Sequence, residues 1–248
     1  MRYEESAVLE LKEQVNADFK KEIIAFANTD GGEIFVGVAR DGSITGVENA
    51  EAEMERIGNM IRDGIKELIV QPTHIINGIE NDLMKEDVLA YADHFDSIRF
   101  GTPLLTSTKD IEEAIRAFME DWKDLPEKEA LVLMGHGTTH YANTAYAALD
   151  YTFKDLGYSN VLIGTVEAYP SIPSILRGLK ELQPEKIHLT PFMIVAGDHA
   201  TNDMAGEEED SWKNQFEAAG YTVECHLKGL GEYEGIRKIF LKHIEESK

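Results

Sequence analysis

From about residue 67 onward, short apolar runs alternate with amphipathic segments of helix length, and no other feature of the sequence constrains the fold as strongly. This alternation is typical of parallel strands joined by crossover helices. Several of the amphipathic segments begin at Ser, Thr, Asn or Pro, which favour helix starts. The sequence therefore predicts an α/β fold. The predicted strands are 67–71, 97–100, 130–134, 160–165, 186–193 and 221–226, and the predicted helices are 79–93, 109–121, 142–156, 172–182, 207–219 and 234–246.

The first 65 residues follow a different pattern. They predict a helix near 17–28, a break at NTDGG, a strand at EIFVGV, a turn at RDGS, a strand at ITGV and a helix at 50–64. Asp41-Gly42 between two apolar runs is typical of a hairpin, so these strands are expected to pair antiparallel. No Pro/Gly/Ser linker or repeat separates this segment from the rest.

Charge and cysteine content limit the functions that the chain can have. The net charge of -22 would repel a phosphate backbone and attract divalent cations, so nucleic acid is a disfavoured partner. The single cysteine, Cys225, excludes an internal disulfide and every cysteine-rich metal cage. Any metal must then be held by His, Asp or Glu. The sequence has no apolar stretch long enough to cross a membrane and no signal-peptide pattern, so a cytoplasmic protein is expected.

Polar residues follow several predicted strands at the point where each strand ends. His74 and Glu80 follow 67–71, His136 and His140 follow 130–134, Glu167 follows 160–165, and His199 follows 186–193. Ligands of open parallel sheets bind at the carboxyl ends of the strands, so these loops should open on one side. Two histidines and a carboxylate suit Co(II), Ni(II), Fe(II) or Zn(II), and neutral imidazole can also accept protons.

Each of these residues also has a simpler interpretation. Gly135-His136-Gly137 can be only a tight turn, and His74 can merely close a loop. His94 and His140 are expected at the surface, and Asp203 or Asn202 can cap a helix. Acids at 207–210 are expected in the first turn of a helix, where the macrodipole favours them. Met134, Met193 and Met204 are more typical of packing than of metal binding.

Read with their flanks, these loops resemble the anaerobic sirohydrochlorin cobaltochelatases of cobalamin biosynthesis. The resemblance covers about residues 66–248, and the spacing between the motifs is also similar to that of the family. The motifs that carry it are VQPTHIINGIE, TPLLTS, LVLMGHGTTHYANTAYAALDY, GTVEAYP and MIVAGDHATNDMAGEEEDSWK.

The resemblance implies a site and a fold. It implies that His136 and His199 bind metal and accept protons, that Glu80 is a third active-site and metal-binding group, and that Glu167 contacts the metal. It implies two similar parallel-sheet halves with helices on both faces and sirohydrochlorin in the cleft between them. No organic cofactor is implied. The divalent metal is a substrate, Co2+ by resemblance, with Ni2+, Fe2+ and Zn2+ left open by the residues themselves. The family's tendency to form homo-oligomers leaves that state open as well.

Residues 1–65 resemble the opening half of a Schlafen/AlbA-type domain, through ESAVLELKE, IIAFANTDGGEIFVGVARDGSITGV and ERIGNMIRDGIK. We therefore expect three parts: a partial Schlafen/AlbA-like segment at 1–65, the remainder of a truncated first chelatase half at 66–104, and the second half at 105–248. In the first half a helix-hairpin-helix segment would replace the missing part. Three functions follow: an active chelatase, an impaired chimera that binds metal or tetrapyrrole without turnover, and a nucleic-acid-binding module at 1–65. The last is disfavoured, because that segment carries 14 acids against 7 bases.

Overall fold

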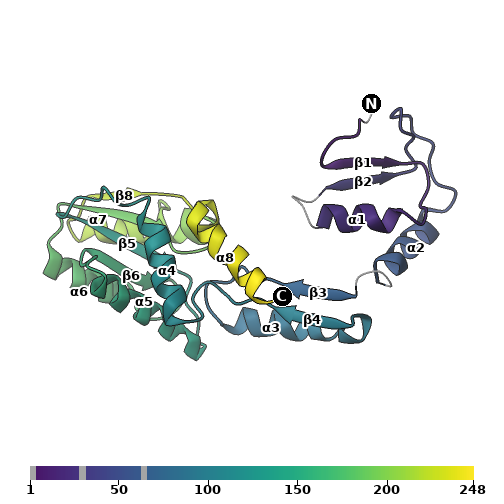
Figure 1. The fold of residues 1–248 in the computed structure, drawn as a ribbon. Helices are drawn as coiled ribbons and strands as arrows, with labels where there is room; N and C mark the ends of the chain where they lie inside the picture. Colours follow the sequence, from purple (N-terminus) through teal and green to yellow (C-terminus); the bar gives the residue numbers. More distant parts are fainter. Residues whose placement is uncertain (1–3, 28–31, 63–65) are drawn as a thin grey trace. The chain divides into compact units, whose positions relative to one another are not determined.

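The computed structural model describes residues 4–27, 32–62 and 66–248, and the chain divides into two compact units (Figure 1). One unit comprises Met1–Leu68 and Tyr91–Ile98, and the other comprises Ile69–Ala90 and Arg99–Lys248. In the described part of the chain, no helix is both long and apolar enough to cross a membrane.

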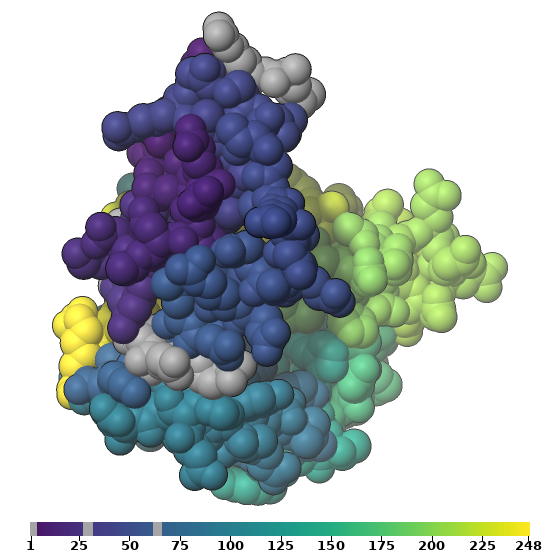
Figure 2. All heavy atoms as spheres, turned by 90° about the vertical axis from the view of Figure 1, so that its right-hand side faces the viewer, coloured from purple at the N-terminus to yellow at the C-terminus, as the bar shows by residue number. Residues whose placement is uncertain are grey.

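The first unit contains a β-α-β arrangement, drawn in purple and blue in Figure 1, and Figure 2 shows the atoms of this part of the chain as spheres in the same colours. Strand β1 (Leu9–Lys12) pairs in parallel with β2 (Glu33–Val36), and α1 (Phe19–Ala27) connects them. The unit also contains helix α2 (Ala50–Arg62) and, later in the chain, the 3-10 turn η1 (Ala92–His94). Leu11, Val15 and Phe19 are buried in this unit. The sequence analysis predicted α1, β2 and α2 but missed β1, whose four residues are too few to show a clear period.

The hairpin predicted around Asp41-Gly42 is reduced to one antiparallel bridge between Val38 and Ile44. Gly37 has a φ of +83° and its carbonyl oxygen accepts hydrogen bonds from the backbone N–H groups of Thr45 and Gly46. This left-handed residue ends β2, so the predicted strand at 44–47 does not form. The predicted break at NTDGG lies almost entirely outside the described residues, as do the predicted ends of the two helices at 28 and 63–64.

Strands β3 (Glu67–Val70) and β4 (Ser97–Phe100) form a two-stranded sheet, and α3 (Ile79–Leu89) lies between them in the chain. Both strands occur where the sequence predicts them. The predicted helix at 79–93 ends earlier, at Leu89, and η1 follows it.

A four-stranded parallel sheet with the order β6-β5-β7-β8 forms the centre of the second unit. Its strands are β5 (Glu129–Gly135), β6 (Val161–Thr165), β7 (Lys186–Pro191) and β8 (Val223–Cys225). The helices are α4 (Thr108–Met119), α5 (Thr144–Asp155), α6 (Ile172–Leu182), α7 (Trp212–Ala218) and α8 (Glu234–Glu246). Short turns of helix are η2 (Tyr141–Asn143), η3 (His199–Met204) and η4 (Leu230–Glu232).

The two faces of this sheet carry separate hydrophobic cores, because successive strand residues point to opposite faces. Leu131 and Leu133 of β5 pack with residues of α4, α5 and α8. Ala130, Val132 and Met134 pack with residues of α6, α7 and η3. The predicted α/β fold with helices on both faces is therefore confirmed for this sheet.

The helix predicted at 207–219 begins only at Trp212. The Ser211 side chain accepts a hydrogen bond from the Asn214 backbone N–H and caps the helix there. The Asn214 side-chain amide donates to the carbonyl oxygens of Glu207 and Glu208, which holds the acidic segment as a loop. The interpretation of residues 207–210 as the first turn of a helix is thus wrong.

Candidate functional site

The strand order explains why the candidate residues meet. After β5 the chain enters α5 on one face of the sheet, whereas after β7 it enters η3 and α7 on the other. Loops that leave neighbouring strands toward opposite faces open a crevice at the carboxyl ends of those strands. His136 follows β5 and His199 begins η3 after β7, so the two histidines stand on the two sides of this crevice.

His136 is held in a turn that requires glycine on both sides. A Cβ at Gly135 would lie 2.4 Å from Cε1 of Tyr146, and Gly137 has a φ of +85°. Nδ1 of His136 lies 2.8 Å from the Gly137 carbonyl oxygen, which can only accept, so Nδ1 carries the hydrogen. The lone pair is then on Nε2. The tight-turn interpretation and the functional one are therefore compatible, since the turn fixes both the place and the tautomer of the imidazole.

Tyr146, on α5, contacts the same turn and stabilises it. Its side chain is 2% exposed, and its hydroxyl accepts hydrogen bonds from the backbone N–H groups of Gly137 and His136. Burial raises the pKa of Tyr146 to about 12, so the phenol stays neutral at physiological pH. The sequence analysis did not identify this residue.

His199 lies at the start of η3, a single turn of π-helix. Its Nδ1 donates to Oδ2 of Asp203 over 2.6 Å, one turn further along. A histidine that donates one ring N–H to a carboxylate presents the other nitrogen as a more basic ligand. Asp203 therefore orients His199 rather than capping a helix. The i, i+4 spacing of His199 and Asp203 is the signal in the sequence from which this pair could have been found.

Three of the four expected metal ligands meet at the crevice. The rings of His136 and His199 are 4.7 Å apart at an angle of 83°, and Nδ1 of His136 is 3.9 Å from Oε2 of Glu167. One ligand atom from each of His136, Glu167 and His199 can be chosen so that all lie within 4.8 Å of one another. Such a group can hold a dication with modest side-chain movement.

A cavity of about 490 Å³ opens at these histidines. This is within the range of about 300–1,000 Å³ that small-molecule sites usually occupy. Glu80, near the start of α3, lines the cavity but is not a member of the three-residue group. His74 also lines it, and its Nδ1 is buried without a hydrogen-bond partner among the described residues. His74 is thus part of the cavity wall, which the loop-closing interpretation did not anticipate.

The cavity lining has an acidic and apolar character. Glu80 and Asp198 contribute carboxylates, and none of the lining residues within the described ranges is a lysine or arginine. Apolar side chains at Ile75, Ile76 and Val195 face the same space. A dication is attracted here, whereas an acidic ligand would have to rely on backbone donors and apolar contact.

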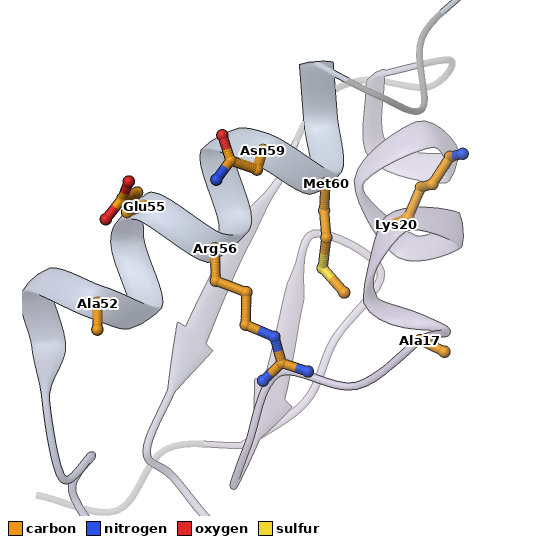
Figure 3. A pocket seen from close by; sticks show the side chains of 7 residues that line it. All are labelled: Ala17, Lys20, Ala52, Glu55, Arg56, Asn59 and Met60. Atoms are coloured by element: carbon orange, nitrogen blue, oxygen red, sulfur yellow. The ribbon is translucent and has the colours of Figure 1, made fainter.

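A second cavity of about 490 Å³ lies in the first unit, between α1 and α2 (Figure 3). Met60 and Arg56 extend from α2 toward the space beside α1, and Lys20 and Glu55 also line the cavity. Its lining contains no histidine in the described residues, and Arg56 forms an ion pair with Glu53 at 3.4 Å. Equal size therefore does not give this cavity comparable metal chemistry.

Comparison with protein families gives a match along almost the whole chain. A model of the cobalt chelatase (CbiK) family matches residues 3–248. Sirohydrochlorin cobaltochelatase of Salmonella typhimurium is 34% identical over 197 residues, which are 79% of this chain and 74% of that protein. Sirohydrochlorin cobaltochelatase CbiKC of Nitratidesulfovibrio vulgaris is 37% identical over 181 residues, which are 71% of this chain and 63% of that protein.

Solved structures agree on the fold. The sirohydrochlorin chelatase SirB of Bacillus subtilis subspecies spizizenii, solved in complex with cobalt, is 14% identical with a TM-score of 0.52, over 97% of this chain and 94% of that one. DR2241 of Deinococcus radiodurans, a multi-domain protein with structural similarity to chelatases, is 14% identical with a TM-score of 0.53, over 98% and 56%. The expected chelatase-like α/β fold is confirmed by these similarities.

Proposed function

The chain belongs to the cobalt chelatase (CbiK) family, and we propose that it inserts Co2+ into sirohydrochlorin at the cavity beside His136 and His199. The observation that carries the proposal is the group of His136, Glu167 and His199, of which the two histidines line this cavity together with Glu80. The family similarity supports the reaction, and the geometry supports the choice of residues.

The two histidines are suited to two successive roles. The Gly137 carbonyl oxygen accepts a hydrogen bond from Nδ1–H of His136, and the Asp203 carboxylate accepts one from Nδ1–H of His199, so in these tautomers Nε2 of each ring carries the lone pair. They can first hold the substrate dication with Glu167 and then, once the metal leaves for the macrocycle, take up the protons that the pyrrole nitrogens lose. Insertion of a dication releases two such protons, one for each histidine.

Glu80 is proposed as the third active-site group. It lies in the wall of the same cavity, outside the group of three donors, so it can accept or relay a proton without holding the metal throughout. Gly78 is a neighbour of this carboxylate, and a Cβ there would lie only 3.3 Å from Oε2 of Glu80. A glycine at the N-cap of α3 therefore leaves space for this carboxylate.

For the domain organisation we propose the division into 1–65, 66–104 and 105–248, with the first part derived from a Schlafen/AlbA-type domain. The order β1, α1, β2 and the Asp41-Gly42 turn fall on the motifs that carry this resemblance. Nucleic-acid binding is not proposed, since four cations of this segment form ion pairs with acids of the same segment. They are Lys12, Lys21, Arg40 and Arg56.

Turnover tests the proposal directly. Purified protein, given Co2+ and sirohydrochlorin without oxygen, should change the absorption spectrum of the tetrapyrrole faster than buffer does. Tight binding of both substrates without this acceleration would instead support the alternative of an impaired chimera, which binds metal and tetrapyrrole without turnover. Insertion rates for Ni2+, Fe2+ and Zn2+, assayed in the same way, would rank these metals as substrates. Rates are needed because binding affinity follows the general order of the divalent metals and does not reveal which metal the protein inserts.

A further inference from the structure

A second group of histidines and carboxylates lies on one face of the central sheet, on the neighbouring strands β7 and β8 and directly after β8. His188 is on β7 and faces Glu224 of β8 in register, and His226 follows directly after β8. Residues in register on parallel neighbours, and residues two apart on extended chain, share a face. Cys225 falls between the two β8 ligands and packs with the core of the opposite face, so it is not part of the group.

The donor atoms of this group have the spacing that a metal ion requires. Nδ1 of His188 is 2.9 Å from Nε2 of His226 and 3.9 Å from Oε2 of Glu224. Nε2 of His226 is 3.7 Å from Oε1 of Glu224. Tetrahedral ligands at about 2.0–2.1 Å from an ion lie about 3.3 Å from one another. Small rotations of the three side chains would bring them to that distance.

Further contacts orient the ligands. Nε2–H of His188 donates to the carboxylate of Glu129 on β5, which leaves Nδ1 as the lone-pair nitrogen directed at His226. The indole of Trp122 meets both imidazoles edge to face, with ring centroids 5.6 Å from His188 and 5.0 Å from His226. The backbone N–H of His226 donates to the Leu189 carbonyl over 2.8 Å. Glu129 and Trp122 therefore restrict the imidazole rings, and the backbone bond fixes the position of His226 beside β7.

The donor set selects the class of ion. Two imidazoles and one carboxylate suit late first-row dications such as Zn2+, Co2+ and Ni2+, whereas Mg2+ and Ca2+ prefer oxygen ligands. The Glu224 side chain is 47% exposed, so an ion can reach the group, although it must compete with Lys186 for this carboxylate. Because Trp122 covers the two rings, this group has no room for a macrocycle above them.

We propose that His188, Glu224 and His226 form a second site for a late first-row divalent metal, which fastens the edge strand β8 to β7 and takes no part in insertion. Strand β8 has only three residues, so its backbone pairing with β7 is short. A metal that binds the folded chain alone would stabilise it by mass action. His188, His226 and Glu224, together with Glu129, can also form a chain of hydrogen bonds without an ion, and the test must distinguish this alternative from a metal site.

Metal stoichiometry of the full chain tests the proposal. After removal of metal with a chelator, equilibrium dialysis against Zn2+ should give two bound equivalents for the wild type, one for His226→Gln, one for His199→Ala and none for the double variant. His140→Gln is the matched control: His140 has one carboxylate neighbour, Asp82 at 3.9 Å, and belongs to no group of three ligands among the residues that the structure describes, so two equivalents should remain. An unchanged stoichiometry in a folded His226→Gln variant would overturn the proposal.

Glu129→Gln gives a second test that does not depend on loss of a ligand. It should weaken Zn2+ at this site about 10–100-fold while the site at His199 keeps its affinity. Zn2+ should also raise the melting temperature of His199→Ala, and this rise should vanish in the double variant. Equal affinities in Glu129→Gln and wild type, or no rise, would favour the hydrogen-bond chain alone. Turnover of His226→Gln should equal that of the wild type. The dialysis and melting measurements do not require turnover, so the loss of one bound equivalent in His226→Gln can still be interpreted if the chelatase proposal, on which the site at His199 rests, fails.

Discussion

The central sheet carries two histidine groups with the same donor set, and they differ in what surrounds them. His136, Glu167 and His199 stand at the carboxyl ends of strands, beside a cavity of about 490 Å³. His188, Glu224 and His226 lie on the face of the sheet beneath Trp122. Each group has a carboxylate that orients one histidine, Asp203 in the first and Glu129 in the second. The comparison teaches that ligands alone do not make a chelatase site, since only the first group opens onto space for a second substrate.

The largest expected effect separates the two groups by turnover. His199→Ala should lower the rate of Co2+ insertion by about 10²–10⁴-fold, because in the proposed function His199 both binds the metal and accepts a proton. His226→Ala should leave the rate unchanged. Initial rates from the spectral change of sirohydrochlorin measure both. Equal losses in the two variants would contradict the division between a catalytic and a structural group.

The orienting carboxylates should give the next largest difference. Asp203→Asn keeps the size of the side chain but removes the negative charge of the group that accepts the hydrogen bond from His199. Turnover should therefore fall about 10–100-fold. Glu129→Gln should leave turnover unchanged. Steady-state kinetics should show the Asp203→Asn loss in kcat rather than in the KM for sirohydrochlorin. A normal kcat in this variant would mean that Asp203 does not position His199.

The turn around His136 should respond to a single methyl group. Gly135→Ala places a Cβ at 2.4 Å from the Tyr146 ring, so it should destabilise the fold by about 1–3 kcal/mol and displace the turn. Gly58→Ala, in α2 with nothing within 4 Å of the new Cβ, is the matched control and should not destabilise. Urea unfolding measures both. If Gly135→Ala left the free energy of unfolding unchanged, Tyr146 would be able to move away without destabilising the fold.

The smallest expected effects come from removing two buried hydroxyl groups, one of which bonds the backbone at His136 and the other the backbone at His226. Tyr146→Phe removes the acceptor for the backbone N–H groups of His136 and Gly137, and Thr190→Val removes a donor to the His226 carbonyl oxygen. Each should cost about 1 kcal/mol in the free energy of unfolding. Only Tyr146→Phe should also lower turnover, by a few-fold. A turnover loss in Thr190→Val would couple the two groups.

Much of the fold was predictable because its signals are local. The helices at 172–182 and 234–246 and the strand at 97–100 have the predicted bounds, since apolar periodicity and helix-start residues mark them in the chain. Asn214, whose amide holds the acidic loop before α7, and Gly37, whose left-handed backbone ends β2, act through contacts that periodicity does not contain. These are the places where the predicted elements were too long.

The sequence by itself determined the α/β alternation and, through motif resemblance, the residues proposed to handle the metal. It also determined that any metal would be held by His, Asp or Glu, because one cysteine cannot form a cage. Only the tertiary structure decided that Asp203 orients His199, that Tyr146 holds the His136 turn, and that His188 and His226 face each other. The strand order β6-β5-β7-β8 and its register bring distant residues to one face and one edge, and neither is encoded in local spacing.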